Sequence, residues 1–137
     1  MSDSSYAVRD GVAWFRLGRG DAYEQDVAAI REALVRAEAA GIDMALVDIT
    51  AVHRGPPTLA EIHWSVREWA TATCGTARVA LVARAEFRDP RRFGTIVAMN
   101  HGLTFRVFTD ETSALGWLHG CGPDSLQLAL EPASVAG

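Results

Sequence analysis

Two short segments of the chain are nearly all apolar, and they constrain the fold more than any other feature. "DMALVDIT" (Asp43–Thr50) and "ARVALVA" (Ala77–Ala83) are also rich in residues that favour β-strands. A strand with one face in water alternates apolar and polar residues, and these runs do not alternate in that way. We therefore expect both segments to be strands of a sheet that is covered on its two faces.

Helices are predicted before, between and after these strands. Apolar residues recur at spacings of three and four in the first helix, and Gly41 follows it as a stop. Thr58 and Glu61 fit a capping box at the start of the second helix, and Asp89-Pro90 predicts the start of the third. The predicted helices span residues 22–40, 58–73, 90–101 and 110–120.

The remaining strands complete an α/β fold. Asp10-Gly11 is typical of a hairpin turn between strands at Tyr6–Arg9 and Val12–Leu17, and "FRVF" (Phe105–Phe108) is the last strand. The order ββαβαβαβα predicts a mostly parallel mixed sheet flanked by helices, with one antiparallel strand from the hairpin. We expect a single domain over residues 1–120, followed by a loosely ordered C-terminal extension over residues 121–137.

The composition argues against several classes of function. The chain has 137 residues and a net charge of −4, which disfavours nucleic-acid binding because neutralising phosphates needs a basic face. No apolar run approaches the roughly 18–20 residues of an integral membrane segment, and the first residues do not resemble a secretory signal. The sequence therefore predicts a cytoplasmic protein.

Motifs for metals, cofactors and catalysis are missing from the sequence. The two cysteines (Cys74 and Cys121) and the four histidines lack the spacing of a zinc site, so we expect no metal. No nucleophile elbow, phosphate loop or dinucleotide-binding fingerprint is present, so we expect no cofactor and no catalytic residue. Asp48, at the end of a buried strand, is expected to accept hydrogen bonds from loop amides.

Three segments together resemble a known family. "MALVDIT…PPT", "ARVALVA" and "RVFTDETSALGWL" are similar to the SpoIIAA-like branch of the STAS family, the sulfate-transporter and anti-sigma-factor-antagonist domains. The resemblance covers roughly Val8 to Leu118, and the core arrangement is also similar to that of lipid-binding CRAL-TRIO modules. It implies a STAS-like fold and a non-catalytic binding or signalling module, which acts through the loop and helix after the third strand on a protein partner or on its own copy.

Thr58 has two interpretations. In the anti-sigma-factor antagonists, a serine at the start of the second helix is phosphorylated by a partner kinase, within an Asp-Ser-Ser-Gly-like motif. The corresponding stretch here is "GPPTLAE", which lacks that motif and offers Thr58 as its hydroxyl. Thr58 is therefore either a helix cap alone or also a phosphoacceptor.

A candidate anion site lies at the predicted carboxyl ends of the strands, where ligands bind in open α/β sheets. Guanidinium groups and helix N-termini favour phosphate or carboxylate groups there, whereas pairing with Glu86 and Asp89 would leave the arginines purely structural. This site suggests an alternative function, a carrier of a small apolar or amphipathic anionic ligand, with a cavity of roughly a few hundred Å³. A second alternative is an unrecognised enzyme. The candidate anion-binding residues are His53, Arg54, Arg84, Arg88, Arg91 and Arg92.

Trp64 is the candidate interface residue. Helical spacing places it opposite the apolar face of the second helix, which is formed by Leu59, Ile62, Val66, Trp69 and Thr73. Tryptophan and arginine are enriched in interfaces, so Trp64 is grouped with Ala60, Arg67 and Thr71. Trp64 could form a homodimer contact, line a ligand-binding groove, or pack under the long loop or the C-terminal tail. An interaction module predicts a filled core and an exposed apolar patch around Trp64.

Overall fold

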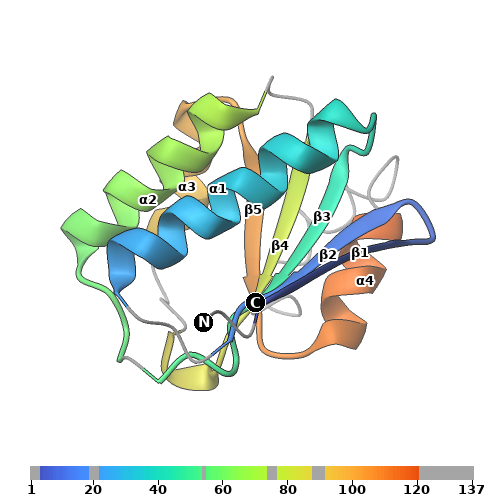
Figure 1. Ribbon diagram of the computed structural model, residues 1–137. Helices are drawn as coiled ribbons and strands as arrows, with labels where there is room; N and C mark the ends of the chain where they lie inside the picture. The colour runs from blue at the N-terminus through green and yellow to red at the C-terminus, as the bar shows by residue number, and fades with distance from the viewer. Residues whose placement is uncertain (1–3, 19–21, 54, 74–76, 88–91, 121–137) are drawn as a thin grey trace.

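The computed structural model describes residues 4–18, 22–53, 55–73, 77–87 and 92–120 (Figure 1). Its elements follow the predicted order ββαβαβαβα, with one short 3₁₀ helix added, so the α/β fold class is confirmed. The extension over residues 121–137 lies outside the described residues, and the domain boundary stays a prediction. The elements are β1 (Ser5–Arg9), β2 (Val12–Arg16), α1 (Tyr23–Ala39), β3 (Met44–Asp48), α2 (Leu59–Ala72), β4 (Arg78–Val82), η1 (Ala85–Phe87), α3 (Phe93–Asn100), β5 (Thr104–Phe108) and α4 (Glu111–His119).

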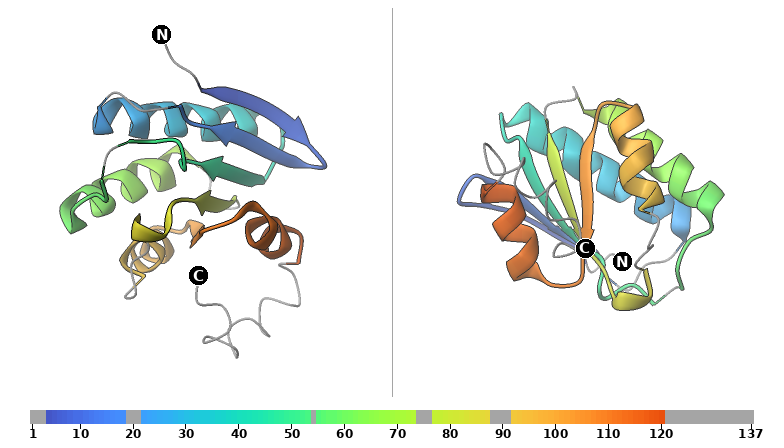
Figure 2. Two further views of the ribbon diagram at one scale, coloured as in Figure 1. Left: turned by 90° about the horizontal axis from the view of Figure 1, so that it is seen from below. Right: turned by 180° about the vertical axis from the view of Figure 1, so that it is seen from behind.

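The five strands form one sheet in the order β1-β2-β3-β4-β5. Strands β1 and β2 are antiparallel, and the other neighbours are parallel. Each crossover moves to the next strand in the same direction, and right-handed crossovers of that kind place their helices on one face. Helices α1, α2 and α3 accordingly cover one face of the sheet, and α4 covers the other (Figures 1 and 2).

Side chains alternate between two buried clusters because successive strand residues point to opposite faces. Val79 faces the larger cluster under α1, α2 and α3, whereas Ala80 faces the smaller cluster under α4. In the larger cluster, the Trp69 ring of α2 packs against the Phe105 ring of β5, with centroids 5.9 Å apart and ring planes tilted by 41°. Both faces of the central strands are therefore buried, as their apolar sequences predict.

Two turns have the left-handed backbone that their sequences predict. Asp10 and Gly11 have φ angles of 54° and 77°, as the hairpin between β1 and β2 requires. Gly41 has a φ angle of 78° and ends α1, where the Ile42 amide donates to the Ala37 carbonyl at 2.9 Å. The glycine stop predicted for the first helix is confirmed.

The predicted start of the third helix is wrong by three residues. Helix α3 begins at Phe93, not at Pro90, because Arg92 has φ 53° and ψ 43°. This left-handed conformation cannot belong to a right-handed helix. The predicted cap at Asp89-Pro90 lies outside the described residues.

Candidate functional site

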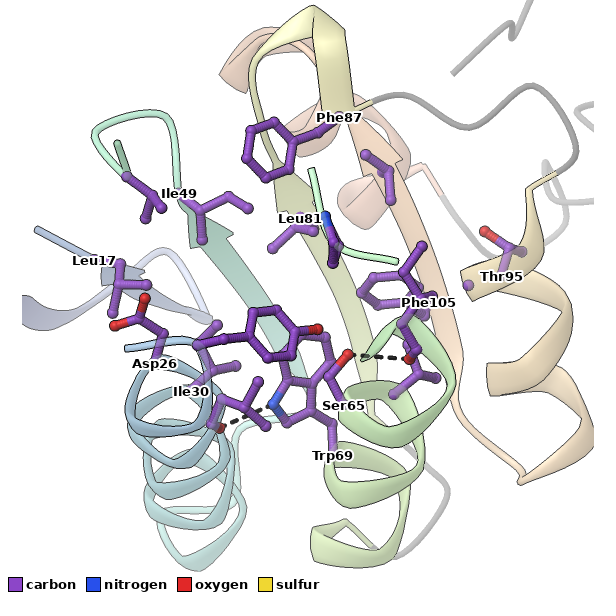
Figure 3. Close-up of a pocket in the computed structure, with 18 of the residues that line it drawn as sticks. Leu17, Asp26, Ile30, Ile49, Ser65, Trp69, Leu81, Phe87, Thr95 and Phe105 are labelled. Atoms are coloured by element: carbon purple, nitrogen blue, oxygen red, sulfur yellow. Dashed lines mark hydrogen bonds between the residues drawn. The ribbon is translucent and has the colours of Figure 1, made fainter. Parts of the chain in front are cut away.

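A cavity of about 110 Å³ lies between the sheet and the helices α1, α2 and α3 (Figure 3). It reaches the surface at the carboxyl end of the strands, where the β3–α2 loop and η1 meet. Gly55 in that loop is exposed, and Phe87 of η1 is half-buried. The walls are mainly apolar and include Leu17, Ile30, Ile49, Trp69, Leu81 and Phe105.

Most of the cavity lining is apolar, and Asp26 and Ser65 are buried polar residues within it. Asp26 of α1 is 8% exposed, and its side chain lies beside Leu17 at one side of the cavity (Figure 3). Ser65 of α2 is 2% exposed, and its hydroxyl donates to the Ile62 carbonyl at 3.0 Å. Asp26 and Ser65 are thus polar residues at buried positions on otherwise apolar helix faces, and neither is among the predicted site residues.

The cavity has an energetic cost when nothing fills it. Unfilled interior volume lowers the free energy of unfolding by about 24 cal/mol per Å³, so this cavity costs at most about 2–3 kcal/mol. The volume is smaller than the few hundred Å³ expected for a carrier, and larger than expected for the filled core of an interaction module.

The structure brings only part of the predicted anion site together. Arg92 lines the cavity and is half-buried, whereas His53 is exposed. Arg84 lies 3.6 Å from the Glu86 carboxylate and over the Phe87 ring, so its charge is balanced locally. Arg54, Arg88 and Arg91 lie outside the described residues. Binding of an anion at this edge of the sheet stays a prediction.

Neither a metal site nor a membrane helix is found in the described part of the chain. Within it, no group of three or more histidine, cysteine, aspartate or glutamate side chains is placed to hold a metal ion. The helices described there are also too short or too polar to cross a membrane.

Thr58 caps helix α2 and is exposed to solvent. Its hydroxyl accepts a hydrogen bond from the Glu61 amide at 3.1 Å, and its own amide donates to the Glu61 carboxylate at 2.9 Å. These two bonds satisfy backbone amides that the first turn of a helix leaves without partners. The geometry accounts for a threonine at this position, and a phosphoacceptor role stays a prediction.

Replacing Thr58 with alanine is expected to lower the free energy of unfolding by about 0.5–2 kcal/mol, because α2 loses its side-chain cap. Thr58→Asp keeps an acceptor at the cap and is expected to stay within about 0.5 kcal/mol of wild type. The matched control is Thr71→Ala, since the Thr71 hydroxyl bonds only to carbonyls of its own helix. Urea unfolding followed by circular dichroism measures all three, and equal losses for both alanine variants would contradict the prediction.

Helical spacing placed Trp64 opposite the apolar face of α2, and in the structure this residue packs against a neighbouring helix. Its ring is half-buried against α1, and its centroid lies 6.2 Å from that of Tyr23. The reason is that α2 packs against α1 as well as against the sheet, so it has a second buried face. Leu59 was predicted to lie on the apolar face of this helix. That prediction is wrong, since this first residue of α2 is 43% exposed. Of the residues grouped with Trp64, Ala60, Arg67 and Thr71 are exposed.

A shallow groove runs over this contact between α1 and α2. It has a volume of about 440 Å³ and is lined by Tyr23, Glu24, Ala60, Glu61 and Trp64. The Tyr23 hydroxyl donates to the Glu61 carbonyl at 3.0 Å, which ties the starts of the two helices together. This hydrogen bond joins the two walls of the groove, which lies beside the capped start of α2.

Asp48 holds the loop after β3 in place. Its carboxylate accepts hydrogen bonds from the Thr50 amide at 2.9 Å and the Thr50 hydroxyl at 2.7 Å, which confirms the expected role. Arg16 of β2 donates to the same carboxylate at 3.1 Å and to Glu111 of α4 at 2.6 Å. Burial alone would raise the pKa of Asp48, but the hydrogen bonds from Thr50 and the charge of Arg16 outweigh it and lower the pKa.

The comparisons with known proteins bear on the fold. No protein-family model matches the sequence, and no curated protein is significantly similar to it. Among solved structures, the chain is similar to an anti-sigma factor antagonist from Mycobacterium paratuberculosis. The TM-score is 0.57 and the identity 16%, and the match covers 87% of this chain and 95% of the other.

These findings define the chain as an α/β domain with the fold of an anti-sigma factor antagonist. The fold that the resemblance to SpoIIAA-like STAS domains implies is therefore confirmed. A likeness at 16% identity shows the fold alone, and proteins that share a fold can differ in function.

Proposed function

We propose that the chain is a non-catalytic binding module that acts in the cytoplasm on a protein partner. The partner would contact the β3–α2 loop and the first two turns of α2. The observation that carries this proposal is the groove in which Trp64 and Tyr23 lie beside the exposed residues Leu59 and Ala60. Aromatic side chains supply much of the binding energy in protein interfaces, and this groove presents two of them. The fold likeness to an anti-sigma factor antagonist supports a protein as the partner.

The charges of the groove indicate the chemistry of the partner. Glu24 is exposed at one wall, and Glu61 forms the other wall. Acidic side chains beside aromatic rings suit a lysine or arginine, because the cation pairs with the carboxylate while its stem packs on the ring. The partner surface is therefore expected to place a basic side chain between apolar ones.

A crosslinking experiment tests the proposal. A photoreactive amino acid at Ala60 is expected to capture a partner in cells, whereas the same group at Ala39, at the far end of α1, is not. With the captured partner purified, Ala60→Arg is expected to weaken binding at least about tenfold, because it blocks the groove and repels a basic side chain. Ala39→Arg is the matched control. Equal affinity of the two variants would contradict the proposed surface.

Self-association is the simplest form of this proposal. If the partner is a second copy, light scattering will show a wild-type dimer that Ala60→Arg converts to a monomer and Ala39→Arg does not. A monomer for all three proteins restricts the proposal to a different partner protein.

The carrier alternative has less support from the structure. The cavity of about 110 Å³ is smaller than the few hundred Å³ expected for a carrier of a small apolar or amphipathic anionic ligand. Arg84, one of the arginines expected at its mouth, is also paired with Glu86.

A further inference from the structure

We propose that the cavity beneath the β3–α2 loop is a binding site for a small, uncharged, apolar molecule about the size of one aromatic ring. This site is separate from the groove between α1 and α2, and it stands whether or not that groove binds a partner. Three properties of the cavity support it: its dimensions and walls, the hydrogen bonds that keep it open, and the charge of its lining.

The size of the cavity sets the size of the occupant. An apolar cavity of about 150 Å³ in another protein stays dry and binds benzene. The cavity here has a volume of about 110 Å³, and its walls include the rings of Trp69 and Phe105. These rings offer faces and edges for stacking with an aromatic or cyclic molecule. A longer chain would have to extend through the opening near Gly55 into solvent.

Hydrogen bonds between the helices keep the cavity open without a ligand. Interiors close around empty space where side chains can shift, so a persistent cavity needs fixed walls. The Trp69 indole donates to the Val27 carbonyl of α1 at 3.1 Å, as Figure 3 shows. The Tyr23 hydroxyl fixes the start of α2 in the same way, through the Glu61 carbonyl. Because these two hydrogen bonds link α1 to α2, they oppose a shift of α2 into the space.

Arg92 is half-buried at the opening, and the rest of the cavity favours an uncharged molecule. Among the described lining residues, Asp26 is the one charged side chain that is buried, and its carboxylate repels an anionic group. The Ser65 hydroxyl gives its hydrogen to the Ile62 carbonyl, so toward an occupant its oxygen is an acceptor. A charged molecule would also lose its hydration against walls that are mostly apolar. The site therefore suits a neutral ring, with or without one hydroxyl that can donate to Ser65.

The opening of the cavity lets such a molecule enter. It lies at the carboxyl edge of the sheet, between exposed Gly55 on one side and half-buried Phe87 and Arg92 on the other. The same edge is where open α/β sheets place their ligands.

Toluene is the probe that tests this proposal, with isoleucine methyl groups observed by NMR. Saturable shifts are expected for the methyl groups of Ile30, Ile49 and Ile62, which line the cavity, but not for exposed Ile96 on α3. The expected Kd is roughly 0.1–1 mM, as for a ligand of so few atoms. Benzoate, a ring that carries an anionic group, is expected to bind at least about tenfold more weakly.

Two variants that fill the cavity from opposite walls provide a second test of toluene binding. Val107→Phe on β5 and Ser65→Leu on α2 are each expected to raise the Kd of toluene at least about tenfold. Val35→Phe, on the exposed face of α1, is the matched control and should leave the Kd unchanged. If one filling variant does not fold, the other still gives the comparison.

Several results would overturn the proposal. Absence of saturable shifts with toluene would contradict the proposed binding site. So would equal toluene affinity in a folded cavity-filling variant and in the Val35→Phe control. Benzoate that binds as tightly as toluene would overturn the assignment of an uncharged ligand. Decanoate that binds more tightly than toluene would show that the occupant is a chain and not a ring.

Discussion

Replacing Trp69 with alanine is expected to lower the free energy of unfolding by about 3–5 kcal/mol, a large part of the stability of a domain of this size. The Trp69 ring is 5% exposed and lies 5.9 Å from the Phe105 ring, between α2 and the sheet. Its indole nitrogen also donates the hydrogen bond that joins α2 to Val27 of α1. Alanine removes this bond and enlarges a cavity that the protein already contains. Urea unfolding followed by circular dichroism measures the loss.

Two further variants separate the contributions of the Trp69 ring. Trp69→Phe keeps most of the packing but loses the hydrogen bond, so a loss between those of alanine and wild type is expected. Trp64→Ala removes a half-buried ring from the same helix and is expected to cost about 1–2 kcal/mol. Equal losses for Trp64→Ala and Trp69→Ala would contradict the view that Trp69 is the main link between α2 and the core.

The fold could be predicted because its signals are local. Segments 43–50 and 77–83 are apolar at nearly every position, which is typical of strands buried on both faces. The hairpin at Asp10-Gly11 and the stop at Gly41 follow from backbone angles that glycine adopts readily. The alternation of strands and helices then leaves few parallel arrangements, and the observed sheet is one of them.

The sequence-based predictions fail where tertiary contacts determine which residues are buried and where a helix begins. A helical wheel assigns one buried face, but α2 packs against both the sheet and α1, so Trp64 is half-buried on a face that the wheel assigns to solvent. The left-handed conformation of Arg92 has no signal in the sequence, because glycine and asparagine are the residues that usually adopt it. This one residue delays the start of α3.

The cavity could not have been predicted from the sequence. Its volume depends on how side chains from three helices and the sheet fill the space between them, and no motif encodes that. The available hint was polar residues within apolar helix faces: Asp26 precedes Val27, and Ser65 precedes Val66. Departures of this kind from an apolar pattern tend to mark functional sites. The arginines were predicted to bind an anion because of their charge, although Arg84 has a local counter-ion in Glu86.

Replacing Asp48 with alanine is expected to lower the free energy of unfolding by about 2–3 kcal/mol at pH 7. The carboxylate is buried and accepts both hydrogen bonds from Thr50, so alanine leaves the amide and the hydroxyl of that residue without this partner. Arg16 also loses one of its two acidic neighbours, although Glu111 remains. Asp43→Ala, at an exposed position before the same strand, is the control and is expected to change stability by less than about 0.5 kcal/mol.

The same carboxylate makes part of the stability depend on pH. The pKa of Asp48 in the folded protein is lowered from its ordinary value of 3.8, so the unfolded chain takes up the proton more readily. The stabilisation is therefore fully present well above pH 3.8 and is lost as the pH falls through the lower, folded-state pKa. Asp48→Asn has no charge to lose, and the difference in unfolding free energy between wild type and this variant is expected to shrink as the pH falls from about 5 toward 2. Urea unfolding of both proteins at each pH measures this difference, because contributions from all other carboxylates cancel. A difference that stays constant from pH 7 to pH 2 would show that the charge on Asp48 does not stabilise the loop, and that its shape and hydrogen bonds alone do.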